Sequence, residues 1–81
     1  MRIEMLLFAT VADQVGATRI ELDLPAASTV SDALDALEAR HVALSEMRPA
    51  LAVAVNHVYA DPATALSEGD EVALIPPVSG G

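Results

Sequence analysis

The last residues of the chain are the ones best suited to chemistry. Gly80 and Gly81 follow a short arm that begins with the proline pair Pro76 and Pro77. Because glycine has no Cβ, a Gly-Gly end can lie extended in a channel too narrow for other residues, while proline fixes φ and stiffens the segment before it. We therefore expect residues 76–81 to form a tail held away from a body of residues 1–75, with the α-carboxylate of Gly81 as its most exposed reactive group. The alternative is an ordinary frayed terminus.

Other reactive groups are scarce. The chain has no cysteine, so nothing indicates a thiol nucleophile or a zinc site. Nothing indicates an oxidising compartment either, and a cytoplasmic location is therefore expected. Its two histidines, His41 and His57, are too far apart in sequence to indicate a metal-binding pair, and we expect no metal. The apolar stretch of residues 5–9 is far too short to span a membrane, so no membrane partner is expected.

Charge and composition restrict the partners. Twelve acidic residues face four arginines and no lysine, for a formal net charge of −8. Binding to a phosphate backbone depends on clustered cations, so we expect no nucleic acid as a direct partner. The acidic surface can steer the chain towards a basic partner or simply keep a small apolar protein in solution. Without a lysine side chain, an activated Gly81 could not form an isopeptide bond with another copy of the chain.

Alternating apolar residues predict one domain that begins with two strands. In residues 2–8, Ile3, Met5 and Leu7 share one face, while Leu6 and Phe8 share the other. In residues 18–24 apolar side chains alternate with charged ones. A short helical turn over residues 9–15, closed by a glycine, connects the two strands. With 53% apolar residues the core needs no metal or disulfide.

The residues after Thr29 predict the main helix. Thr29 is a candidate N-cap, and Asp32 follows three residues later as in a capping box. Arg40 and His41 lie near the C-terminal end, where positive charge is favourable, and His41 is expected on the surface. Apolar residues at helical spacing form one buried stripe: Val30, Ala33, Leu34 and Leu37.

Three further strands complete the prediction. Pro49 begins an extended piece in which residues 51–55 are typical of a central strand buried on both faces. Asn56 and His57 predict a tight turn into a short strand at residues 58–59. Breaking residues at 67–70 then precede the last strand, residues 71–75.

This order of elements predicts an α+β fold in which one main helix packs on one face of a mixed sheet of four or five strands. The first and last strands are expected to be central neighbours. The face away from the helix would then carry Leu6, Phe8, Ala73 and Ile75 beside the base of the tail, and an apolar cluster there indicates a docking surface for a partner. The alternative is that Phe8 belongs to the core.

At this point the sequence resembles a known family. The residues that carry the resemblance are Leu7-Phe8-Ala9 with Val15-Gly16, the segment Ala54-Val55-Asn56, and above all residues 66–81, where Gly69-Asp70-Glu71-Val72 leads into Pro76-Pro77-Val78-Ser79-Gly80-Gly81. They are similar to the small subunit of molybdopterin synthase, a sulfur carrier with the ubiquitin-like β-grasp fold. The similarity extends over nearly the whole chain, apart from residues 38–49.

The resemblance implies a role in building molybdopterin. Gly81 would be adenylated by an ATP-dependent adenylyltransferase similar to the ubiquitin-activating enzymes and converted to a thiocarboxylate with sulfur from a donor protein. The large synthase subunit would then use it to deliver sulfur to cyclic pyranopterin monophosphate. Gly80 would be a slim spacer, and Pro76, Pro77, Val78 and Ser79 the arm that enters the large subunit.

The same resemblance implies that no cofactor is bound permanently, since ATP is used only by the activating enzyme. The catalytic side chains would lie on the large subunit, so this chain would be a co-substrate and subunit more than a catalyst. The assembly would be a heterotetramer of two small and two large subunits.

Two other interpretations stay open. A sulfur carrier for thiamine thiazole synthesis or transfer-RNA thiolation would share the fold and the Gly-Gly end, although residues 76–79 and the extra segment at residues 9–15 resemble the molybdopterin type more. The second is a ubiquitin-like interaction module whose tail is chemically inert.

Overall fold

The computed structural model describes residues 1–77, and alternating apolar residues form strands in it where the sequence predicts them. The strands are β1 (Arg2–Leu7), β2 (Arg19–Asp23), β3 (Ala52–Val55), β4 (Val58–Tyr59) and β5 (Glu71–Ile75). The helices are α1 (Ala9–Val15), α2 (Val30–Arg40) and α3 (Leu44–Met47), followed by the 3₁₀ helix η1 (Arg48–Ala50). No helix among residues 1–77 is long and apolar enough to cross a bilayer.

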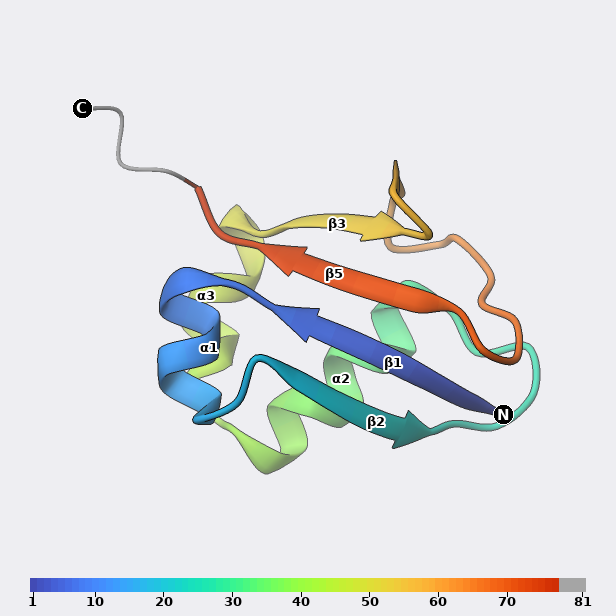
Figure 1. Ribbon diagram of the computed structural model, residues 1–81, viewed down its shortest axis with the longest axis horizontal. Coiled ribbons are helices and arrows are strands. Elements are labelled where there is room, and N and C mark those ends of the chain that lie inside the picture. Colours follow the sequence, from blue (N-terminus) through green and yellow to red (C-terminus); the bar gives the residue numbers. More distant parts are fainter. Residues whose placement is uncertain (78–81) are drawn as a thin grey trace.

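The five strands form one mixed sheet in the order β2-β1-β5-β3-β4 (Figure 1). The first and last strands are parallel neighbours at its centre, with Leu7 beside Leu74, as predicted. β2 pairs with β1, β3 with β5 and β4 with β3, all antiparallel. Because alternate residues of a strand face opposite sides, Met5, Leu7, Val72 and Leu74 point towards the helices, where all four are buried. α2 lies across this face, and the opposite face is left uncovered (Figure 1).

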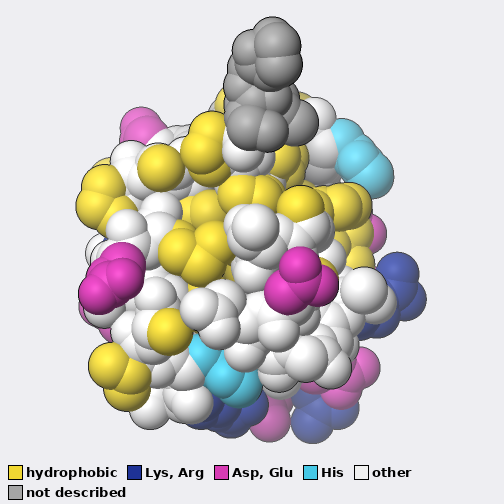
Figure 2. Space-filling model, turned by 90° about the vertical axis from the view of Figure 1, so that its left-hand side faces the viewer, with side chains coloured by type: hydrophobic (Ala, Val, Ile, Leu, Met, Phe, Trp, Pro, Cys, Tyr) yellow, Lys and Arg dark blue, Asp and Glu magenta, His cyan; other side chains and the backbone are white. Residues whose placement is uncertain are grey.

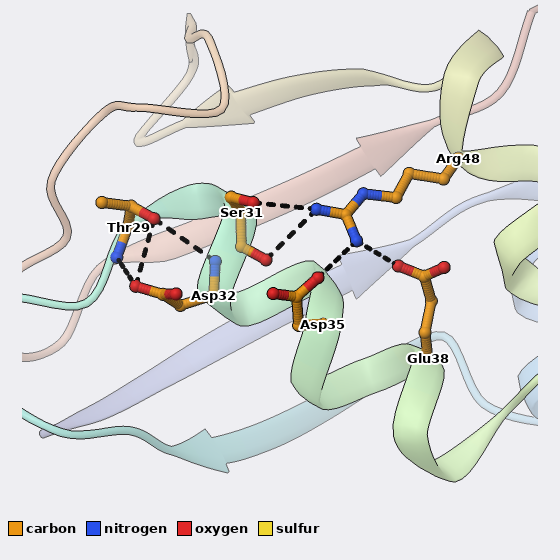
Figure 3. Close-up of polar contacts among 6 residues, drawn as sticks. All are labelled: Thr29, Ser31, Asp32, Asp35, Glu38 and Arg48. Atoms are coloured by element: carbon orange, nitrogen blue, oxygen red, sulfur yellow. Dashed lines mark hydrogen bonds and ion pairs between the residues drawn. The ribbon is translucent and has the colours of Figure 1, made fainter.

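The main helix forms for the local reasons that the sequence indicates. The Thr29 hydroxyl accepts a hydrogen bond from the Asp32 amide at 3.3 Å, and the Asp32 carboxylate accepts one from the Thr29 amide at 2.8 Å (Figure 3). This reciprocal capping box pairs two donors that the first turn leaves free. The predicted stripe is buried: Val30, Ala33, Leu34 and Leu37.

The segment after α2 differs from the prediction. Pro49 does not begin an extended piece, because it lies inside η1. Proline is tolerated there since it falls in the first turn of a helix, where its missing N–H would have no intrahelical partner. The extended chain of β3 begins only at Ala52.

The guanidinium of Arg48 holds this segment against α2 (Figure 3). Arg48 donates hydrogen bonds to the Asp35 carboxylate at 2.6 Å, to the Glu38 carboxylate and to Ser31 Oγ at 2.9 Å. The hydrogen bond to Asp35 is the main reason why the pKa of Arg48 is raised above its ordinary value. These partners lie 10 to 17 residues from Arg48 in sequence, so no local pattern indicates them.

β3 is less central and less buried than predicted. The centre of the sheet is formed by β1 and β5, and β3 lies between β5 and the two-residue strand β4. Val53 and Ala54 are buried, whereas Ala52 and Val55 are only half-buried. A partner strand as short as β4 cannot cover the whole length of β3.

Candidate docking surface and base of the tail

An apolar row crosses the sheet face that the helices leave uncovered. The register places Leu6 beside Ala73, Ala73 beside Ala54, and Ala54 beside Tyr59. Directly opposed residues on neighbouring strands point to the same face. The row therefore extends across β1, β5, β3 and β4.

Ile75 lies two residues beyond Ala73 on β5, and Phe8, which is still extended just after β1, lies two residues beyond Leu6, so both share this face with the row. Six apolar residues form what we call the open-face patch: Leu6, Phe8, Ala54, Tyr59, Ala73 and Ile75. Together with His57 and Glu71 they line a shallow pocket of about 280 Å³. The four residues expected from the sequence are thus brought together. Phe8 is 46% exposed, so the alternative that it belongs to the core is wrong.

Sequence reasoning missed Ala54 and Tyr59 as members of the patch. The signal that places them is the turn at Asn56 and His57, which both have positive φ, of 50° and 71°. These angles are typical of a type I′ turn with a two-residue loop. Such a loop pairs Val55 with Val58, and the next pair along the strands is Ala54 with Tyr59.

The pocket is charged at the end away from Phe8. His57 Nε2 lies 3.5 Å from Glu71 Oε1, and the His57 imidazole is almost fully exposed. Asn56 ties the turn to β5, because its side-chain oxygen accepts a hydrogen bond from the Glu71 amide at 3.0 Å and its Nδ2 donates to Asp70 at 2.9 Å. The uncovered face is therefore apolar where β1 and β5 end and polar where β5 begins.

The base of the tail adjoins the apolar end of this face. Pro76, half-buried, and Pro77, exposed, continue from β5. With Thr10, Met47, Ala50 and Leu51 they line a groove of about 190 Å³. Figure 2 looks onto this end of the molecule and shows hydrophobic side chains gathered on it.

The predictions for Val78, Ser79, Gly80 and Gly81 concern residues outside the described part of the chain. They stay predictions. What the described residues establish is the position of Ile75, from which the tail departs, beside Phe8 on the uncovered face.

Another pocket, of about 590 Å³, lies between α2, η1 and the β3–β4 hairpin. Leu34, Leu51, Val53 and Tyr59 contribute apolar walls, and Arg48, already paired with carboxylates, is the charged residue that lines it. No group of three metal-ligating side chains occurs among residues 1–77.

Comparisons with known proteins find relatives over the whole chain. A model of the ThiS family matches residues 5–81. The chain is 35% identical over 81 residues to a molybdopterin synthase sulfur carrier subunit from Arabidopsis thaliana, with all of this chain and 84% of that protein covered. It is 39% identical over 87 residues to small archaeal modifier protein 1 from Haloferax volcanii, with 98% and 100% covered.

Solved structures agree with the fold. A crystal structure of SAMP1 from Haloferax volcanii superposes with a TM-score of 0.91 at 38% identity and covers both chains fully. The protein–protein complex of subunits 1 and 2 of molybdopterin-converting factor from Helicobacter pylori contains a chain that superposes with a TM-score of 0.71 at 26% identity, again over both whole chains. The ubiquitin-like β-grasp fold predicted from the sequence is confirmed.

Proposed function

The chain belongs to the ThiS family, and from this premise we propose that it is a sulfur carrier, specifically the small subunit of a molybdopterin synthase. The observation that carries the proposal is that the family match extends to Gly81, so that the glycine pair is part of the similarity. The 35% identity to a sulfur carrier subunit of molybdopterin synthase, over the whole chain, supports the finer assignment.

Gly81 is the reacting group in this proposal. A carboxylate is a poor electrophile, so an ATP-dependent adenylyltransferase first joins it to AMP and releases pyrophosphate. A sulfur donor at the oxidation level of sulfide then attacks the glycyl carbonyl carbon, and AMP leaves as the bond from that carbon to the phosphate oxygen breaks. The product is a thiocarboxylate.

The thiocarboxylate is the sulfur nucleophile for the next reaction. Its sulfur attacks a carbon of cyclic pyranopterin monophosphate, and the bond from that carbon to an oxygen substituent breaks as the oxygen leaves. Water then cleaves the bond between the acyl carbon and sulfur. Sulfur stays on the substrate, and the carboxylate of Gly81 is restored. The general acids and bases for these steps belong to the partner enzymes.

The open-face patch is the proposed docking surface for the large subunit. Apolar patches on a small protein mark interaction sites, and the Helicobacter pylori relative is solved in complex with its subunit 2. Because Ile75 lies in the patch, a partner bound there is next to the start of the tail. Six extended residues reach about 20 Å at most, which allows Gly81 to enter an active site away from the docking surface.

Intact-mass measurement tests the carrier function. The chain is incubated with ATP, the adenylyltransferase and a sulfur donor, and we expect it to gain the mass difference between sulfur and oxygen. Gly81→Ala and deletion of Gly81 should fold normally and abolish sulfur transfer. No gain in mass, with an enzyme that is active on its own carrier, would refute the proposal. Binding to a thiazole synthase but not to the large subunit would assign the carrier to thiamine synthesis.

Protein modification is a second candidate function, favoured by the 39% identity to small archaeal modifier protein 1. Attack on the same adenylate by an amine of another protein would give an amide bond in place of a thiocarboxylate. The two functions predict different products. A modifier forms conjugates of higher mass in which Gly81 is joined to lysines of cellular proteins. In contrast, cells that lack a synthase subunit fail to make active molybdoenzymes.

A further inference from the structure

The backbone is strained at the residue after Phe8. Ala9, the first residue of α1, has a φ of 48°. This left-handed conformation is sparsely populated by residues with a Cβ, and such residues cluster at functional sites. Ala9 is exposed, so no packing of its own methyl group accounts for the conformation.

The conformation of Ala9 lets the chain change direction within one residue. Phe8 is still fully extended, with φ of −121° and ψ of 150°, and so keeps the same face as Leu6. Its carbonyl already accepts the hydrogen bond of the Val11 amide at 3.0 Å. Val11, three residues after Phe8, is completely buried, whereas Phe8 is 46% exposed. A sharp junction of this kind presents the side chain of Phe8, the residue between β1 and α1, outside the core.

A second strained alanine provides a comparison. Ala27 has a φ of 68°, in the four-residue turn that Pro25 and Ser28 close with a hydrogen bond of 3.2 Å. The third position of a type II turn requires positive φ, so the connection between β2 and α2 explains this strain. Ala27 lines a different pocket, formed with Leu24 and Asp32, and has no part in the open-face patch.

We propose that Ala9 is a positioning residue, whose left-handed backbone holds Phe8 on the open-face patch for docking of the large subunit. The inference rests on the proposed function, because it assigns a role within the proposed docking surface. Residues that tolerate positive φ should preserve the position of Phe8, and β-branched residues, which do not, should lose it.

The test uses the fact that Phe8 is the only phenylalanine in the chain. Full-length protein labelled with 4-fluorophenylalanine gives a single fluorine resonance, which reports on Phe8 alone and needs no partner. The spectrum and the dissociation constant for the large subunit are measured for wild type, Ala9→Gly, Ala9→Asn and Ala9→Val. Ala27→Val is the matched control, since it makes the same change at the other strained alanine.

We expect Ala9→Gly and Ala9→Asn to keep the wild-type resonance and to bind within about twofold of wild type, because both tolerate positive φ. Ala9→Val should shift or split the resonance and weaken binding by about tenfold or more, as the loss of an aromatic anchor does. Ala27→Val should lower the melting temperature without changing either readout. If Ala9→Val is unfolded at the assay temperature, Ala9→Thr, which is also β-branched but polar at this exposed position, takes its place with the same expected result.

Two results would overturn the inference. One is an unchanged resonance and affinity in Ala9→Val. The other is equal loss of affinity in the glycine, asparagine and valine variants, which would mean that the alanine methyl group matters and not the backbone. Failure of the wild-type chain to bind the large subunit would instead refute the proposed function, and the docking role of Ala9 with it.

Discussion

Phe8 should contribute far more to binding of the large subunit than to the stability of the fold. Its ring lies on the uncovered face, and the core beneath it is formed by its buried neighbours on β1, among them Leu7. We expect Phe8→Asp to weaken binding to the large subunit by about tenfold or more, because docking would bury a carboxylate that has no partner there. The melting temperature should change by only a few degrees. Calorimetric titration and thermal unfolding measure the two effects.

Val42→Asp is the control for that substitution. Val42 is 75% exposed and lies after α2, outside the open-face patch. The Val42→Asp substitution introduces the same negative charge at an exposed apolar position, so the affinity for the large subunit should stay at the wild-type value. A large loss of stability in Phe8→Asp would contradict the prediction that this exposed side chain contributes mainly to binding.

Arg48 is the residue that attaches α3 and η1 to α2. We expect Arg48→Met to destabilise the protein by about 1–3 kcal/mol, since it leaves two carboxylates and a serine without their donor. For a domain of this size that lowers the melting temperature by about 4–8 °C for each kcal/mol. Because its pKa is raised, Arg48 stays charged at any pH below the ordinary arginine value, so the effect should not vary across neutral pH. Arg40→Met, at an exposed site, should cost well under about 1 kcal/mol.

At the scale of elements, the β3–β4 hairpin brings Tyr59 to the patch through a turn whose second residue is not the one that this turn type favours. His57 adopts a φ of 71°, which favours glycine, and Asn-Gly is the preferred pair for a type I′ turn. We expect His57→Gly to stabilise the protein by about 0.5–1 kcal/mol in thermal unfolding. The lost contact with Glu71 contributes little, because the imidazole is exposed.

His57→Ala separates the two effects of that change. It removes the same imidazole but keeps a Cβ, so it should give no gain in stability. Equal stabilisation by alanine and glycine would mean that loss of the side chain, and not relief of the backbone, is responsible.

At the scale of the whole molecule, the folded body and the reacting terminus are separable. Among residues 1–77, the buried residues of the hydrophobic core all lie between Ile3 and Leu74. A chain that ends at Pro77 should therefore unfold within about 2 °C of the full-length protein. It should still bind the large subunit through the open-face patch, and it should compete with the full-length carrier in a synthase assay while donating no sulfur. A truncated chain that folds but does not compete would place the docking energy in residues 78–81.

The sequence determined the features that depend on neighbours within a few residues. Alternation of apolar side chains predicts β1 and β2, and an apolar run after breaking residues predicts β5. A capping box at Thr29 predicts the start of α2, and Asn56 with His57 predicts the hairpin turn. These signals are local because strand alternation, capping hydrogen bonds and turn angles each depend on residues only one to three positions apart. The resemblance in residues 66–81 added the fold and the reacting group.

Only the tertiary structure decided which surface stays uncovered. Periodicity assigns Leu6 and Phe8 to one face of β1, but it does not say whether that face is packed or open. The answer depends on α2, α3 and η1 all lying on the other side, and on contacts such as those of Arg48, which join residues far apart in sequence. No local pattern predicts the positive φ of Ala9 either, because alanine ordinarily adopts negative φ.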